Sequence, residues 1–162
     1  MFKDRERYVE GEYRFRRGYC KSNPRKMVAV WAEKEFRNLS RIYKSVIKCP
    51  EPLCVKSNVL IMQFMGRDGV AAPRLKDADV ENYELIYKET LRYMRILFHD
   101  CKLIHADLSE YNLLYYEDTL YMIDVSQSIE HDHPHSLEFL KRDIHNINNY
   151  FSKMGVNVYP LR

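Results

Sequence analysis

A long amphipathic stretch in the middle of the chain limits the choice of fold most strongly. Between about Asp79 and Asp100, mostly apolar residues recur every three or four positions, which is the period of an α-helix with one buried face. The residues on that face are Val80, Tyr83, Tyr87, Thr90, Leu91, Met94, Leu97 and Phe98. A stripe of this length must be covered by other elements, so the sequence predicts a packed domain.

Turn residues and short apolar runs on either side of this helix predict the other elements. Asn23-Pro24 is a typical helix start, and near-helical spacing continues to about Tyr43. Two β-hairpins are expected, a loop is expected over 65–77, and a last helix should begin near His133-Pro134-His135. The hairpins join 53–57 to 59–65 and 113–116 to 120–124. The order of helix, hairpin, helix, loop, hairpin and helix is typical of an α+β domain.

Length and composition are those of a folded chain. The 162 residues suffice for one compact domain or part of a larger one, and 46% hydrophobic with 13% aromatic residues argue against disorder. Cys20, Cys49, Cys54 and Cys101 lack CxxC spacing and indicate free thiols in a reducing compartment. The charged amino terminus does not resemble a signal peptide, and no apolar stretch is long enough to span a bilayer. We therefore expect a cytoplasmic or nuclear protein with no membrane partner.

The net charge is distributed unevenly. Residues 1–44 hold 13 basic and 6 acidic residues, a net +7, whereas residues 45–162 hold 13 and 17, a net −4. The basic residues Arg14, Arg16, Arg17, Lys21, Arg25 and Lys26 alternate with Tyr13, Phe15 and Tyr19. Such a mixture could bind RNA, whose phosphates pair with basic groups and whose bases stack on rings, but a solvated charged face is the preferred interpretation.

The segment after the long helix carries residues suited to phosphate chemistry. His105-Ala106-Asp107 is followed five positions after the aspartate by Asn112, which is the spacing of a kinase catalytic loop. Asp124 ends the run "LYMID", where kinases place a metal-binding aspartate. Carboxylate and amide oxygens at these positions are suitable ligands for Mg²⁺ during phosphoryl transfer from ATP.

Longer stretches carry a specific family resemblance. "HADLSEYNLL", "IDVSQSIEHDHPHSLEFLKRD", "GEYRFRRGYCKSNPRKMVAVWAEKEFRNL" and "CPEP" closely resemble the RIO family of atypical serine/threonine kinases, in its first subfamily. The matches extend from about residue 2 to residue 158. The resemblance implies a protein-kinase-like fold, with an incomplete N-lobe and hinge over 1–65 and most of a short C-lobe with the catalytic loop over 66–162.

The resemblance also implies roles for single residues. Asp107 would be the catalytic proton acceptor, Asn112 a metal ligand, and Asp124 a second metal ligand. Because the family is thought to act as an ATPase, Asp124 would also be a candidate for transient phosphorylation on its carboxylate.

The nucleotide base is expected at the hinge. The run "LIMQFMG" resembles a hinge strand, in which Met62 borders the adenine pocket while the Gln63 carbonyl and the Met65 N–H bind the base. Glu35 resembles the glutamate of the family's N-lobe helix, with Glu33 as the alternative register.

Two parts of the family pattern are absent. The family's phosphate loop and strand lysine precede the segment that matches residues 2–5, so we expect this chain to lack both and Glu35 to lack its ion-pair partner. The five glycines, at 11, 18, 66, 69 and 155, form no phosphate-loop motif, and a further C-terminal helix would follow residue 162. A fragment of an active enzyme, a product without catalysis and a divergent kinase all remain open.

Two functional hypotheses follow from these residues. The first is a RIO-type serine/threonine kinase or ATPase that binds ATP and Mg²⁺, acts on an unidentified protein substrate and contributes to maturation of the small ribosomal subunit. The second is a catalytically inactive module that binds the pre-ribosomal particle, through RNA or protein, with its basic amino-terminal half.

Histidines are expected to be structural. His105 precedes the catalytic aspartate and is interpreted as a packed residue that supports the loop. The run His131-Asp132-His133-Pro134-His135 suggests zinc, but no cysteine is near it in sequence, so a polar loop is the preferred interpretation.

Overall fold

The computed structural model describes residues 24–160. Most of the basic and aromatic run, and the expected helix cap Asn23, lie outside the described residues. Helix α1 spans Pro24–Tyr43 and confirms the first predicted helix, including its end. Its buried side chains include Trp31, Leu39 and Ile42. None of the helices in the described part of the chain is long and apolar enough to cross a membrane.

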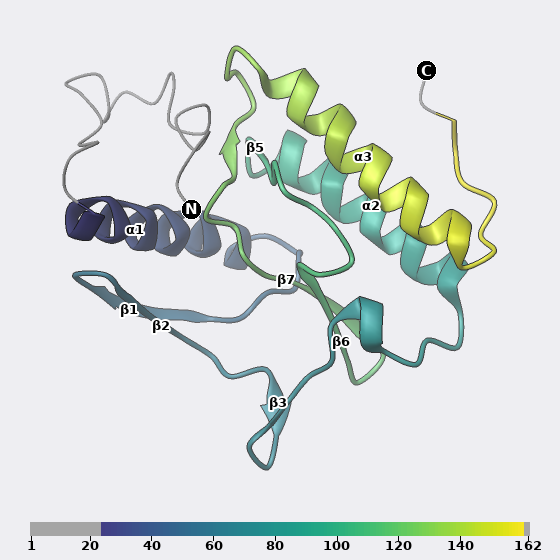
Figure 1. The fold of residues 1–162 in the computed structure, drawn as a ribbon, viewed down its shortest axis with the longest axis horizontal. Coiled ribbons are helices and arrows are strands. Elements are labelled where there is room, and N and C mark those ends of the chain that lie inside the picture. The colour runs from purple at the N-terminus through teal and green to yellow at the C-terminus, as the bar shows by residue number, and fades with distance from the viewer. Residues whose placement is uncertain (1–23, 161–162) are drawn as a thin grey trace.

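The two predicted hairpins are present and antiparallel. Strand β1 (Pro52–Lys56) pairs with β2 (Val59–Met62), and Cys54 lies opposite Ile61. Strand β6 (Leu113–Tyr116) pairs with β7 (Thr119–Met122), and Leu113 lies opposite Met122. One face of the first hairpin lies against α1, as Figure 1 shows.

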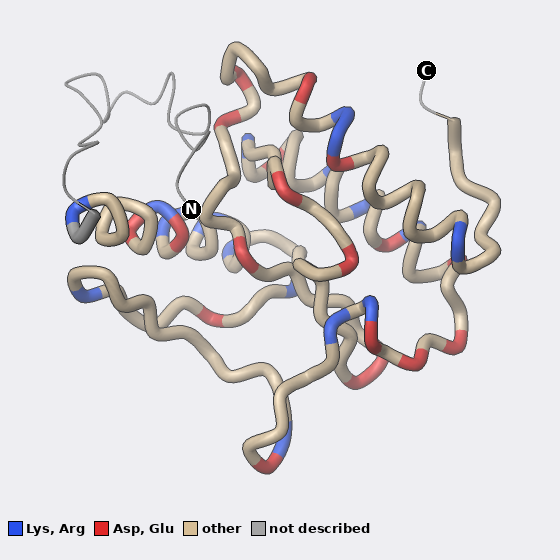
Figure 2. The backbone as a smooth tube through the Cα atoms, viewed as in Figure 1, with Lys and Arg blue, Asp and Glu red and all other residues tan. Residues whose placement is uncertain are grey.

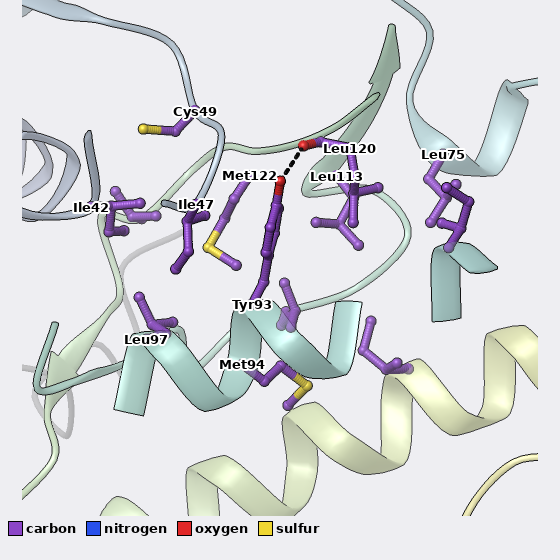
Figure 3. Packing of buried hydrophobic residues seen from close by; sticks show 14 of the residues in the cluster. Ile42, Ile47, Cys49, Leu75, Tyr93, Met94, Leu97, Leu113, Leu120 and Met122 are labelled. Carbon is purple, nitrogen blue, oxygen red and sulfur yellow. Dashed lines mark hydrogen bonds between the residues drawn. The ribbon is translucent and has the colours of Figure 1, made fainter. Parts of the chain in front are cut away.

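Helices α2 (Tyr83–His99) and α3 (Ser136–Lys153) lie side by side behind the second hairpin (Figure 1). Between them and β7 lies the main core, in which Tyr93 is 2% exposed. The Tyr93 hydroxyl donates to the Leu120 carbonyl at 3.1 Å (Figure 3). It also accepts from the Lys48 N–H at 3.3 Å. The core therefore contains a polar link that ties α2 to β7 and to the loop after α1.

Some boundaries differ from the prediction. The middle helix begins at Tyr83 rather than near Asp79, because the Asn82 side chain caps it by accepting the Leu85 N–H at 3.0 Å. The last helix begins at Ser136, after the residues where it was expected to start. Helix α2 buries Tyr87, Thr90, Met94 and Leu97 of its predicted stripe. Helix α3 buries Ile147 and Phe151, but Leu137 near its start is 63% exposed.

The predicted loop over 65–77 contains structure of its own. It holds a small hairpin, β3 (Gly66–Arg67) with β4 (Val70–Ala71), and a single 3-10 turn, η3 (Leu75–Asp77). The hairpin projects from the body of the molecule, and its tip carries charges of both signs (Figures 1 and 2). Gly66 is required there, since its φ is +154° and an added Cβ would lie 2.1 Å from the Val70 carbonyl oxygen.

A second short antiparallel pair, besides β3–β4, was not predicted from the sequence. Strand β5 (Leu103–Ile104) pairs with β8 (Ile129–Glu130). The loop that carries Asp107 follows β5, and the segment after Asp124 ends in β8. This pairing closes residues 103–130 into one compact unit.

Candidate active site

The loop between β5 and β6 carries Asp107 and Asn112, and its own hydrogen bonds shape it. The Asn112 amide nitrogen Nδ2 donates to the Asp107 carbonyl at 2.8 Å, and the Asn112 backbone N–H donates to the Ser109 carbonyl at 3.0 Å. Both side chains are half-buried. Since Nδ2 is engaged, the amide oxygen of Asn112 is the atom that remains to ligate a cation.

Helix α3 holds the backbone on both sides of Asp107. The buried Asp143 accepts the Ala106 N–H at 2.8 Å and the Leu108 N–H at 3.0 Å. Arg142 donates to the Ala106 carbonyl, and Asn146 donates to the Leu108 carbonyl at 3.3 Å. Burial raises the pKa of Asp143, although the nearby His105 and Arg142 and the two N–H donors oppose this change.

These bonds hold an unusual backbone. Ala106 has a φ of +65°, a left-handed conformation that is costly for a residue other than glycine. Its side chain is fully buried, so it cannot relax toward solvent. The α3 contacts therefore fix the position from which Asp107 projects.

Asp124 lies just after β7 and is joined to the catalytic loop through its neighbour Ile123. The Ile123 N–H donates to the Asn112 carbonyl at 3.0 Å, and the Ile123 carbonyl lies 3.1 Å from His105 Nε2. Asp124 itself is exposed and has a φ of +55°. The structure thus brings Asp107, Asn112 and Asp124 into one site and gives His105 the supporting position expected of it.

Helix α1 adds a third carboxylate to this site, beside Asp124. Glu35 is half-buried, and burial together with the negative charge of Asp124 raises the pKa of Glu35 from 4.5 to about 7. Glu33, the alternative register, is exposed. Of the two glutamates, Glu35 is therefore the one that shares the electrostatic environment of Asp124.

The hinge between β2 and β3 leaves a characteristic pair of backbone groups available. The Gln63 N–H donates to the Glu51 carbonyl at 2.8 Å, and the Met65 carbonyl accepts the Ala72 N–H at 2.8 Å. The Gln63 carbonyl and the Met65 N–H have no hydrogen-bond partner among residues 24–160. These two groups are the ones expected to bind adenine, and the half-buried Met62 packs beside them against the core.

Other candidate sites are less well supported. Among the described residues, no three His, Cys, Asp or Glu side chains gather as a metal site, and His133 is buried with its Nδ1 accepting the His135 N–H. A groove of about 710 Å³ lies between the loop after α1 and helix α2, with Lys48 and Arg92 in its lining. None of the predicted site residues lines this groove, so we do not assign the chemistry to it.

The sequence reasoning missed the residues that support the site. Asp143 lies on the apolar stripe of α3, between Leu140 and Ile144, where a charged residue is uncommon unless a partner holds it. A charged residue on an apolar helix face is a sequence signal that could have identified Asp143. Asn38, which donates to the Val125 carbonyl at 2.9 Å, gave no comparable signal because α1 also carries polar residues on its exposed face.

The elements and the site residues are arranged as in a protein kinase. A loop carries Asp107 and Asn112, Asp124 follows a strand, Glu35 lies on a helix, and a short connection between two strands offers backbone groups to a base. The family model for the RIO domain matches residues 1–162, and the chain belongs to this family. The relatives with high identity are Rio1 serine/threonine kinases from several eukaryotes.

Three relatives illustrate the similarity. The serine/threonine-protein kinase rio1 of Dictyostelium discoideum is 62% identical over 159 residues, which cover 97% of this chain and 28% of the relative. RIO1 of Saccharomyces cerevisiae is 56% identical over 167 residues, which cover 100% of this chain and 34% of the relative. RIO1 of Homo sapiens is 52% identical over 164 residues, which cover 100% and 29%. The chain thus spans about a third of the length of these relatives.

Solved structures show the same fold. The Rio2 kinase of Chaetomium thermophilum aligns with a TM-score of 0.74 and 24% identity, over 90% of this chain and 47% of that one. A second structure of that kinase, an ADP/Mg²⁺-phosphoaspartate complex, aligns with a TM-score of 0.73 and 22% identity, over 90% and 46%. The predicted kinase-like α+β fold is confirmed.

Proposed function

We propose that this chain carries the metal-binding and acceptor half of a RIO-type ATP-dependent serine/threonine kinase or ATPase. The observation that carries the proposal is the position of Asn112, whose side chain bonds to Asp107 and whose carbonyl accepts the Ile123 N–H next to Asp124. Asn112 is therefore bonded both to the backbone of Asp107 and to the backbone next to Asp124.

The donor set suits Mg²⁺. The Asn112 amide oxygen and the Asp124 carboxylate are hard oxygen ligands, and the amide nitrogen is already engaged. Glu35 beside Asp124 is a carboxylate pair whose repulsion a cation would relieve. Bound Mg²⁺ would supply charge neutralisation at the phosphates of ATP.

The remaining residues bind and orient the reactants. The Gln63 carbonyl and Met65 N–H would bind adenine, and Asp107 would orient the attacking hydroxyl or water and accept its proton. Alternatively, the Asp124 carboxylate takes the phosphoryl group first, as the phosphoaspartate in the Rio2 complex indicates for that protein.

The wider role is proposed from the family. We infer a function in maturation of the small ribosomal subunit, in contact with the pre-ribosomal particle and in the cytoplasm or nucleus. The net charge of +7 over residues 1–44 supports contact with RNA or with an acidic protein. A catalytically inactive binding module on the same particle remains the second candidate, and that charge is the observation in its favour.

Calorimetry of Mg²⁺-dependent ATP binding to the 162-residue chain separates the two candidates. We expect micromolar affinity that Asp124→Ala reduces at least tenfold, because one metal ligand is lost. Asp132→Ala, which removes a carboxylate from an exposed loop position, is the matched control and should bind as the original chain does. Absence of Mg²⁺-dependent ATP binding would contradict the enzymatic proposal and favour the binding module.

A further inference from the structure

The backbone around Asp124 is fixed on both sides. On one side, Ile123 is held by the Asn112 carbonyl and by His105, as described above. On the other side, Val125 is fully buried, and its carbonyl accepts Asn38 Nδ2 at 2.9 Å and the Ser128 N–H at 3.2 Å. With both neighbours fixed, the freedom that remains at Asp124 is mainly rotation of its side chain.

The Asp124 side chain has one hydrogen-bond partner that the structure defines. The Ser126 hydroxyl donates to Asp124 Oδ1 at 3.0 Å, and Ser126 is half-buried on the turn that Asn38 ties to α1. The nearby Glu35 carboxylate repels Asp124 and cannot orient it by donation while ionised. The rotamer of Asp124 therefore depends on Ser126.

We propose that Ser126 is a positioning residue that reserves one oxygen of Asp124 for phosphoryl acceptance. The Ser126 hydroxyl bonds to Oδ1 and leaves Oδ2 of the exposed Asp124 side chain available to a phosphoryl donor. This inference rests on the proposed function, since it concerns the step in which Asp124 is phosphorylated.

The step balances without any further reactant. Asp124 Oδ2 forms a bond to the γ-phosphorus of ATP, and the bond from that phosphorus to the β,γ-bridging oxygen breaks. The electron pair remains on ADP, and Asp124 becomes an acyl phosphate whose carbonyl oxygen is Oδ1. The Ser126 hydroxyl donates to Oδ1 before and after the step, so it orients the carboxylate without gaining or losing its proton.

Acid-quenched labelling with [γ-³²P]ATP and Mg²⁺ tests the proposal. Label on Asp124 is recognised because hydroxylamine cleaves acyl phosphates, and Asp124→Asn should abolish it. We expect Ser126→Ala to slow formation of this label about tenfold while leaving the Kd of Mg²⁺-ATP within about twofold, because one orienting hydrogen bond is lost and no ligand is removed. Ser126→Thr keeps the hydroxyl and should restore the rate.

The controls separate positioning from general destabilisation. Ser152→Ala is the matched substitution at an exposed position near the end of α3 and should label at the original rate. An unchanged labelling rate in Ser126→Ala, a failure of Ser126→Thr to restore it, or no hydroxylamine-sensitive label in a chain that binds Mg²⁺-ATP would overturn the role of Ser126. Loss of Mg²⁺-ATP binding by the unsubstituted chain would instead overturn the proposed function on which this role rests.

Discussion

The catalytic-loop region, residues 103–125, and the hinge region, residues 52–71, are built on opposite principles. The first is enclosed by α2 and α3, and its buried residues include Leu103, Leu108, Leu113, Leu120 and Met122, each at most 1% exposed. The second is open: Leu53, Val59, Ile61, Phe64 and Val70 are all at least 50% exposed. Figure 1 shows the same contrast, with helices behind the catalytic loop and α1 alone over the first hairpin.

The difference shows which structural elements position the groups that bind metal and phosphate and which position the groups that bind the base. Residues expected to hold metal and phosphate lie on a backbone that helix side chains fix, whereas the groups expected to hold the base are backbone atoms of a short connection. Substitutions behind the catalytic loop should therefore affect folding and chemistry together. Substitutions on the open face of the hinge region should leave the fold nearly unchanged.

The largest effect is expected from Asp143→Ala. The substitution leaves the buried Ala106 and Leu108 N–H groups without their acceptor, and at about 2 kcal/mol for each bond to a charged group we expect a loss of about 4 kcal/mol in the free energy of unfolding. Urea denaturation measures this quantity. Asp132→Ala, at an exposed position, should change it by less than about 0.5 kcal/mol. A loss below about 1 kcal/mol for Asp143→Ala would show that α3 does not hold the loop.

A matched pair of core and surface truncations sharpens the comparison. Leu113→Ala removes a side chain that is 0% exposed and should destabilise the chain by about 3 kcal/mol, through lost burial and a cavity. Ile61→Ala removes a side chain that is 50% exposed and should cost less than about 1 kcal/mol. Similar losses in the two variants, measured by thermal or urea unfolding, would contradict the distinction between the regions.

The smallest effect is expected at the boundary between the regions, where α1 brings Glu35 to Asp124. The pKa of Glu35 is raised from 4.5 to about 7, so the stabilising contribution of its protonated form is complete below pH 4.5 and is lost as the pH rises through 7. Without divalent cations, Glu35→Gln should match the original chain at pH 4. At pH 8 it should be more stable by about 2 kcal/mol, because solvent screening of the partly exposed carboxylate reduces the full value of about 3 kcal/mol. Urea denaturation measures both stabilities. If Glu35→Gln and the original chain are equally stable at pH 8 as well as at pH 4, ionisation of Glu35 does not destabilise the fold.

Much of the fold was readable from local patterns. The helix that ends at Tyr43, both main hairpins and the apolar stripes of the later helices follow from spacing and turn residues alone. The β5–β8 pair was not readable, because Leu103 meets Glu130 only after the intervening loop has folded. The β3–β4 hairpin was not predicted for another reason: strands of two residues are too short to show an alternation of apolar and polar residues.

The candidate site divides in a similar way. The spacing of a kinase catalytic loop predicted Asp107 and Asn112, and the end of a strand run predicted Asp124. In the structure the Asn112 side chain bonds to the Asp107 carbonyl, and the Asn112 carbonyl accepts the Ile123 N–H next to Asp124. The contributions of Asp143, Asn38 and Ser126 depend on which carbonyl, amide or carboxylate each side chain reaches in three dimensions. Local sequence patterns predict the groups expected to act, whereas the residues that support them are defined only by tertiary contacts.

The left-handed φ angles of Ala106 and Asp124 also have a spectroscopic consequence. Such an angle is unfavourable for a residue other than glycine, although less so for aspartate, so each residue should return mainly to a negative φ once the surrounding bonds open. In a nuclear magnetic resonance spectrum, the amide-to-α-proton couplings of these two residues would then report the backbone conformation at each position separately. One reports whether α3 still grips the catalytic loop, and the other reports whether the strand-end aspartate is still held, before any nucleotide or metal is added.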